Sequence, residues 1–145
     1  MNKKVIDSLC HLLADTYLIY VKTQNFHWHV MGPYFHSFHK MFEEQYLQLA
    51  LAVDEIAERI RALNHAAPAT FAEFLELTHL KEDRKNLNAN TMVKTLLHDH
   101  ETIIASLKKL IKAAQEAGDE ETADLGITRC EEHEKTAWML RSSLE

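Results

Sequence analysis

Apolar residues recur along almost the whole chain at the three- and four-residue steps of an amphipathic helix. The first two such patterns cover residues 3–30 and 36–64, and a break that contains Gly32 and Pro33 separates them. The second pattern alternates steps of four and three, as helix packing in a bundle requires. Its members are Phe42, Tyr46, Leu49, Val53, Ile56, Ile60 and Leu63. The two segments are therefore predicted to form long helices joined by a tight turn.

A long connection separates this pair of segments from a second pair. It runs from about residue 67 to 90 and is predicted to contain a short helix near Thr70 to His79, with Thr70 as its N-cap. The helical patterns that follow cover about 90–117 and 119–144, on either side of Gly118. Two helices, a crossover and two more helices make an all-α chain with the arrangement of a ferritin-like four-helix bundle. The short helix is expected in the crossover between helices two and three.

The middle of the second predicted helix carries a further apolar face. Its apolar residues outside the core stripe are Leu47, Ala50, Leu51 and Ala52. A surface helix of a monomer needs only one apolar stripe, so this second face must be covered as well. The sequence therefore predicts a protein interface at the centre of this helix, around residues 48 and 49.

Two pairs of potential metal ligands occupy the two halves of the same helix. His39 and Glu43 form one pair and Asp54 and Glu58 the other, and four-residue spacing places each pair on one face. The pairs lie about 22 Å apart at 1.5 Å per residue, whereas metal–ligand bonds are roughly 2 Å long. His27 is expected near His39 because the break between the helices is short. The spacing therefore predicts a metal site shared by two copies across a two-fold axis at the middle of the helix.

Each of these positions also has an ordinary interpretation. A pair of carboxylates four residues apart is usually a solvated helix face, and an isolated histidine is more often a surface or core residue than a ligand. Imidazole and carboxylate together suit Fe(II), Mn(II) or Zn(II). The ordinary di-iron centre inside a four-helix bundle would instead require Glu-x-x-His on two helices. Only Glu76 and His79 have that spacing, and they lie in the predicted crossover.

Composition narrows the class of protein further. The 145 residues, 46% hydrophobic and 26% charged, are expected to fold as a single domain over residues 1–145. No stretch reaches the roughly 18 apolar residues of a membrane span, and no signal-peptide pattern is present, so a cytoplasmic protein without a membrane partner is expected. Cys10 and Cys130 lie in helical patterns and are expected to be reduced thiols. The net charge of −6, with only Lys3 and Lys4 at the amino terminus, argues against a basic arm for nucleic acid.

Several runs of the chain resemble the signature of the Dps family, the mini-ferritins also called DNA-binding proteins from starved cells. The matching runs are Asn-Phe-His-Trp-His-Val-Met-Gly-Pro-Tyr-Phe (25–35), His39, Glu43, Val-Asp-Glu-Ile-Ala-Glu-Arg (53–59), Gly-Asp-Glu-Glu-Thr-Ala-Asp-Leu (118–125) and His-Glu-Lys-Thr-Ala-Trp (133–138). The resemblance spans almost the whole chain. It implies a hollow tetrahedral homo-dodecamer built from two-fold dimers, with a ferroxidase centre at each dimer interface.

The resemblance also implies the ligands and the reaction. His27, His39 and Glu43 of one subunit and Asp54 and Glu58 of its mate would bind iron, two ions at each centre. Hydrogen peroxide, or O2, would oxidise Fe(II), and ferric mineral would be stored in the cavity. Because peroxide is consumed in a two-electron step, the hydroxyl radical of one-electron Fenton chemistry is avoided. No organic cofactor is implied.

Other residues are expected beside this centre. Trp28 adjoins His27 and could donate an electron to a stray oxidant, although packing at the interface is the alternative. Asp119 and Asp124 match family positions that line a negatively charged pore at the three-fold axis, and charge at the start of a helix also suits the helix dipole. His36, one turn before His39, is a candidate auxiliary ligand.

Two further histidine-containing positions are not expected to bind the same metal. His29 is about 200° around the helix from His27 and is interpreted as a hydrogen-bonded structural residue. The run His98-Asp99-His100-Glu101 resembles a metal cluster, but neighbouring residues of a helix diverge. These four residues are therefore expected on a solvated or interface surface.

The sequence thus favours an iron-oxidising and iron-storing protein that detoxifies peroxide. The alternative is a nucleoid protein that binds and protects DNA, with iron oxidation secondary. Because the chain lacks a basic tail, DNA binding is expected to be weak or absent at neutral pH. A shell without a metal site is disfavoured, since every ligand position that the resemblance implies is filled.

Overall fold

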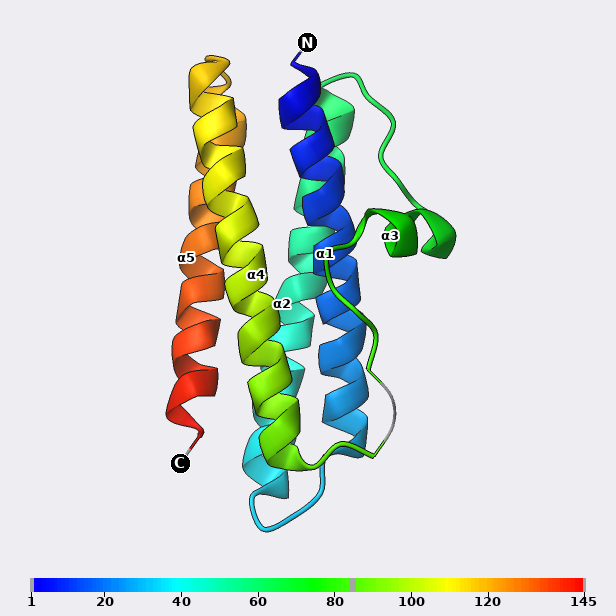
Figure 1. The fold of residues 1–145 in the computed structure, drawn as a ribbon, viewed down its shortest axis with the longest axis vertical. Coiled ribbons are helices and arrows are strands. Elements are labelled where there is room, and N and C mark those ends of the chain that lie inside the picture. Colours follow the sequence, from blue (N-terminus) through cyan, green and yellow to red (C-terminus); the bar gives the residue numbers. More distant parts are fainter. Residues whose placement is uncertain (1, 84–85, 145) are drawn as a thin grey trace.

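The computed structural model describes residues 2–83 and 86–144. These residues contain five α-helices and no β-strand (Figure 1). The helices are α1 (Lys3–His29), α2 (Phe35–Ala62), α3 (Phe71–Leu77), α4 (Ala89–Glu116) and α5 (Glu120–Ser142). The all-α fold and the short helix in the crossover are as the sequence predicts. None of the helices in these residues is both long and apolar enough to cross a membrane.

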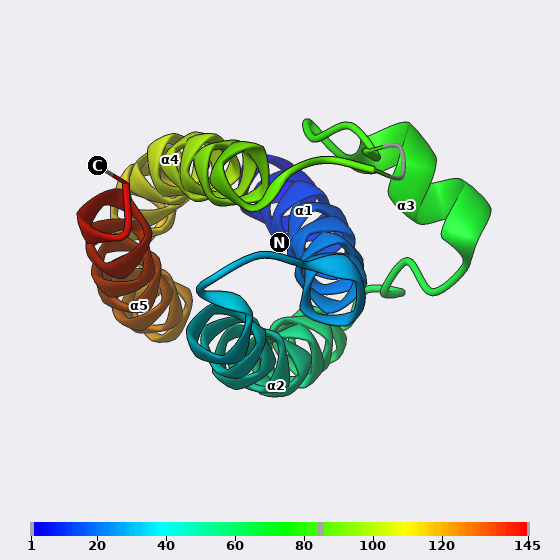
Figure 2. The same cartoon turned by 90° about the horizontal axis from the view of Figure 1, so that it is seen from below.

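The four long helices lie side by side, and α3 stands outside the bundle against α1 (Figures 1 and 2). Viewed end on, α1 and α4 lie on one side of the bundle and α2 and α5 on the other. The helices of each hairpin, α1 with α2 and α4 with α5, pack most extensively. The long crossover that contains α3 joins the two hairpins, which is the arrangement of ferritin-like bundles.

Polar side chains at the helix starts accept hydrogen bonds from backbone N–H groups that have no partner within the helix. The N-cap residues are Asn2, Thr70, Asn88 and Asp119. The Thr70 hydroxyl accepts from the N–H of Glu73, and the Glu73 carboxylate accepts from the N–H of Ala69, a variant of the capping box. Gly118, with φ +72°, ends α4 in a left-handed conformation that a residue with a side chain would adopt only with strain.

The predicted stripe of α2 faces the bundle core. Phe42, Leu49, Val53, Ile56 and Ile60 are buried, and the other two members of the stripe are half-buried. On the opposite face, Leu47 and Leu51 are 54% and 69% exposed, as expected for an apolar surface that awaits a partner. The prediction was wrong for Ala52, which is buried on the core side. Helix α3 adds two more exposed apolar side chains, Phe71 and Leu75.

The run from His98 to Glu101 corrects a second prediction. His98 and Glu101 are exposed, but Asp99 and His100 are buried. Asp99 and His100 follow the buried Leu96 by three and four residues, so they lie on the same face of α4. That face is the core stripe of the helix, and their side chains therefore do not reach solvent. Each is instead paired with a buried group of another helix. Burial raises the pKa of Asp99 although the ammonium of Lys22 lies 2.5 Å from its carboxylate.

Both cysteines are free thiols, as expected. Cys130 is buried and Cys10 is half-buried, and burial raises the pKa of each thiol. The thiolate forms are therefore disfavoured, and these residues contribute packing rather than reactivity.

His100 pairs with His133 of α5 in the interior of the bundle. Each imidazole is 1% exposed, and the two Nδ1 atoms are 2.8 Å apart. Burial lowers the pKa of His100 to about 3 and that of His133 well below its ordinary value. Both rings are therefore neutral in the folded subunit at physiological pH, whereas in the unfolded chain they gain protons as the pH falls below 6.5.

Acid should consequently destabilise the subunit through this pair. Stability that is complete above the unfolded pKa of about 6.5 is lost as the pH falls, by about 2 kcal/mol at pH 5 from His100 alone. Guanidinium unfolding at pH 7 and pH 5 measures the loss. A variant with His100→Leu and His133→Leu should lose clearly less stability over the same interval, and an equal loss in both proteins would contradict this explanation.

Candidate metal centre

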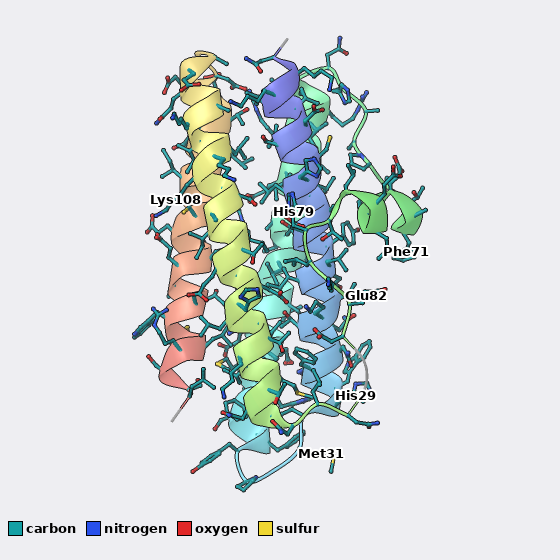
Figure 3. All side chains as sticks on the ribbon, viewed as in Figure 1. His29, Met31, Phe71, His79, Glu82 and Lys108 are labelled. Atoms are coloured by element: carbon teal, nitrogen blue, oxygen red, sulfur yellow. The ribbon has the colours of Figure 1, made fainter. Side chains whose placement is uncertain are left out.

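Two stacked imidazoles stand where the α1–α2 hairpin closes, the end of the bundle at which Figure 3 labels His29 and Met31. His27 lies in the last turn of α1 and His39 in the second turn of α2. Their ring centroids are 3.8 Å apart and their planes differ by 13°. The turn between the helices is short because Gly32 adopts φ +123°, which other residues rarely reach. The predicted proximity of His27 and His39 is therefore present in the structure.

The two rings hold each other through the backbone. His27 Nδ1 donates to the carbonyl oxygen of His39 at 2.7 Å, and His39 Nδ1 donates to the carbonyl oxygen of His27 at 2.7 Å. A carbonyl oxygen can only accept, so each Nδ1 carries the proton and each Nε2 keeps its lone pair. Metal-binding histidines have this second hydrogen bond as a rule, because it fixes the tautomer and the ring orientation.

The surroundings restrict both imidazoles further. His27 is buried and His39 is half-buried. The Phe35 ring stacks on His39 with centroids 4.9 Å apart, and the Tyr46 ring lies 5.3 Å from that of His27. Glu43 follows His39 by one turn of α2 and is half-buried. The hairpin end thus offers two oriented nitrogen ligands and a nearby carboxylate.

Asp54 and Glu58 lie in the other half of α2, where both are exposed. A hydrogen bond with Asp54, together with its like charge, raises the pKa of Glu58. A cation bound between two such carboxylates favours their ionised forms. Asp54 also lines a groove of about 340 Å³ between α1, α2 and the start of the crossover, which Tyr17 and Phe74 border.

Within one chain the two ligand pairs do not converge. Among the described residues, no group of three or more His, Cys, Asp or Glu side chains is placed to hold a metal ion. This agrees with the separation expected along α2, and it means that any centre that uses both pairs requires a second chain.

The residues expected beside the centre are partly accounted for. Trp28 is 62% exposed, so it can reach a neighbouring chain. His29 is hydrogen-bonded, as expected, to the carbonyl oxygen and to the side chain of Asn25, and it is exposed. His36 is also exposed.

The two aspartates expected at a pore differ in their surroundings. Asp124 is exposed, whereas Asp119 caps α5 and accepts a hydrogen bond from Arg59 Nη2 at 3.0 Å. Partial burial opposes its ionisation, but hydrogen bonds from Thr122 and the charge of Arg59 hold the pKa of Asp119 below its ordinary value. Arg59 Nε also donates to the Thr122 hydroxyl at 3.0 Å. Asp119 is therefore ionised and paired, and Asp124 has the freer charge.

The sequence did not lead us to predict the role of Arg59 or a set of charged residues in the bundle interior. Lys22 lies 2.5 Å from the Asp99 carboxylate and 2.8 Å from that of Asp83, and Asp15 accepts hydrogen bonds from Thr78 and His79 of the crossover. A signal was present, because Asp15 and Lys22 share the helix face of the buried residues Ile19 and Phe26. A charged residue on a core stripe indicates a buried partner.

Comparisons with known proteins agree with this fold. The family model of the ferritin-like domain matches residues 6–145. DNA protection during starvation protein 2 of Bacillus anthracis is 42% identical over 144 residues, which cover 99% of both chains. The crystal structure of Dps from Staphylococcus aureus matches with a TM-score of 0.96 and 37% identity, over 99% of this chain and 97% of that one. The chain belongs to the Dps family of ferritin-like proteins.

A third relative bears on the chemistry. The Dps protein of Vibrio cholerae matches with a TM-score of 0.95 and 31% identity, over 99% of this chain and 90% of that one. It is described as a member of a broad superfamily of ferritin-like diiron-carboxylate proteins.

Replacing Arg59 tests the bond network at the start of α5. The change Arg59→Met removes hydrogen bonds to Asp119 and Thr122, so the free energy of unfolding should fall by about 1–3 kcal/mol. Arg61→Met is the matched control, since Arg61 is exposed and its side chain donates, among the described residues, to the carbonyl oxygen of His65 alone. Chemical denaturation of both variants gives the comparison, and equal effects would show that the Arg59 bonds contribute nothing special.

Proposed function

We propose that the protein oxidises Fe(II) at centres formed where two copies meet, and stores the ferric product inside a hollow shell. The observation that carries this proposal is the His27–His39 pair. Its hydrogen bonds to backbone carbonyls leave both Nε2 lone pairs for a metal ion before any metal arrives. The same hydrogen bonds join α1 to α2, so one contact serves both the hairpin and the proposed iron site.

The second copy supplies the carboxylates. If two α2 helices cross antiparallel at residues 48 and 49, His39 and Glu43 of one helix lie opposite Asp54 and Glu58 of the other. The exposed Leu47 and Leu51 lie beside that crossing and would be buried by it. One two-fold operation therefore covers the apolar face and completes two iron-binding sites, each with nitrogen and oxygen ligands that suit Fe(II).

Iron is the substrate of the proposed reaction. Two Fe(II) ions each lose one electron, and hydrogen peroxide accepts both electrons while its O–O bond breaks. The oxygen atoms leave as water after taking up two protons, so charge and atoms balance. Trp28 lies next to the ligand His27 and would donate an electron if an oxidant escaped this two-electron step. In a homo-dodecamer, Asp124 with the paired Asp119 would line the pore through which Fe(II) enters.

Mixed assemblies test the shared centre. One variant carries His27→Ala and His39→Ala, and the other carries Asp54→Ala and Glu58→Ala. Each alone should lose fast Fe(II) oxidation yet still assemble, because apolar contacts hold the interface. When subunits of both kinds are unfolded and reassembled together, some interfaces regain one complete set of ligands, and part of the activity should return.

The rate of Fe(II) oxidation under anaerobic peroxide is the readout, with sizing to verify that the shells are mixed. Mixed shells no faster than either parent would exclude a centre that draws its ligands from two chains.

DNA coating is the alternative function, and one contact argues against it. Lys3, half of the basic pair at the amino terminus, lies 2.7 Å from the carboxylate of Asp7. An exposed pair of this kind contributes little to stability, but it reduces the charge available to a phosphate backbone. The net charge of −6 for each subunit repels a polyanion further.

We therefore expect no stable complex with duplex DNA at physiological salt and neutral pH. Lowering the pH toward 6 should weaken the repulsion, because imidazole groups in general gain positive charge over that range. A gel-shift series over pH and salt concentration measures this. Tight binding at pH 8 and 150 mM salt would make DNA coating the leading function.

A further inference from the structure

A second histidine pair lies in the interior of the bundle and shares no residue with the proposed iron centre. His100 of α4 and His133 of α5 face each other through Nδ1 atoms 2.8 Å apart. Arg129 of α5, itself 5% exposed, places Nη2 3.0 Å from His133 Nε2. Three buried side chains from two helices thus form one chain of polar contacts.

The chemistry of the groups fixes the direction of every hydrogen bond. A guanidinium can only donate, so His133 Nε2 must accept and must lack a proton. His133, which is neutral, therefore carries its proton on Nδ1 and donates it to Nδ1 of His100. His100 in turn has its proton on Nε2. The order of donation runs from Arg129 through His133 to His100.

Without Arg129, such a pair of imidazoles would be a potential binding site for a metal ion. To bind one ion in place of the shared proton, the two nitrogens would have to separate from 2.8 Å to roughly 3.3 Å, since two Zn–N bonds of roughly 2.0–2.1 Å meet at a tetrahedral angle. Metal centres inside four-helix bundles use inward-facing side chains of several helices in this way.

Arg129 opposes a metal in two ways. A metal on His133 Nδ1 would move the proton of that ring to Nε2, where it would meet an N–H of Arg129 donor to donor. The buried positive charge also repels a cation where the dielectric constant is low. Burial lowers the pKa of Arg129, but the carboxylates of Glu132 and Glu55 act in the opposite direction and favour its charged form.

We propose that Arg129 holds the His100–His133 pair in a tautomer that cannot bind a metal ion, and so keeps divalent metals out of the bundle core. We call this arrangement of Arg129, His133 and His100 the lock. The evidence for it is the geometry of these three residues. Its consequence, that iron reaches only the centre between subunits, rests on the proposed function.

Metal binding without oxidant tests the lock. The parent protein carries His27→Ala and His39→Ala, so that the imidazoles at the subunit interface are absent. Into it are introduced Arg129→Gln, whose amide oxygen can accept a proton from His133, and Arg129→Lys, which remains a cationic donor. Co(II) alone is the probe, followed by its visible absorption and by equilibrium dialysis.

The Gln variant should bind about one Co(II) per subunit, at least about tenfold more tightly than the parent. Tenfold is the lower end of the change in metal affinity that is typical when the hydrogen-bond partner of a metal-binding histidine is replaced. The Lys variant should bind no better than the parent. Adding His133→Phe to the Gln variant should abolish the gain, which assigns the ion to the core pair.

Circular dichroism and sizing establish which variants fold. Arg129→Met, which removes both charge and donors, serves as a second unlocked variant if Arg129→Gln does not fold. Absence of Co(II) binding in a folded unlocked variant overturns the proposal, and so does equal binding in the Lys variant or in the parent. Because no oxidation is measured, failure of the proposed ferroxidase function would leave these outcomes unchanged.

Discussion

The paired hydrogen bonds between His27 and His39 are the interaction on which the site depends. Each ring donates to the backbone of the other, so α1 and α2 are joined at the hairpin end by the same atoms that set the tautomer of both rings. The short turn at Gly32 makes this contact possible, and the burial of His27 shields it from water. One contact therefore sets both the closure of the hairpin and the orientation of the two rings, and it leaves the Nε2 lone pairs available to a ligand.

The chain contains two histidine pairs, one with lone pairs free for a metal ion and one without. The hydrogen-bond partners of the ring nitrogens account for the difference. Backbone carbonyls accept from Nδ1 at His27 and His39, which leaves lone pairs for a metal. A guanidinium donates to His133, which removes the lone pair that a metal would need on Nδ1. Both pairs consist of the same residue type, so composition alone could not distinguish them. The hydrogen bonds to the backbone carbonyls at His27 and His39, and to Arg129 at His133, distinguish the two pairs.

The helices and the ligand spacing could be predicted because they depend on local periodicity. The stripe of α2, the Thr70 cap and the distance between His39 and Asp54 along one helix follow from positions in the sequence. Buried polar pairs could not be predicted in the same way, because each depends on a partner far along the chain. Asp99 was assigned to the surface for that reason, since its partner Lys22 lies on α1. Arg59, whose partner Asp119 begins another helix, was missed on the same ground.

In the proposed function, two chains build one metal centre. Diffraction at the iron absorption edge, from crystals soaked anaerobically with Fe(II), tests it most directly because it locates the ion and its ligands together. We expect iron between His27 and His39 of one subunit and Asp54 and Glu58 of another. Iron bound by the side chains of a single subunit, at the hairpin end or between His100 and His133, would contradict it.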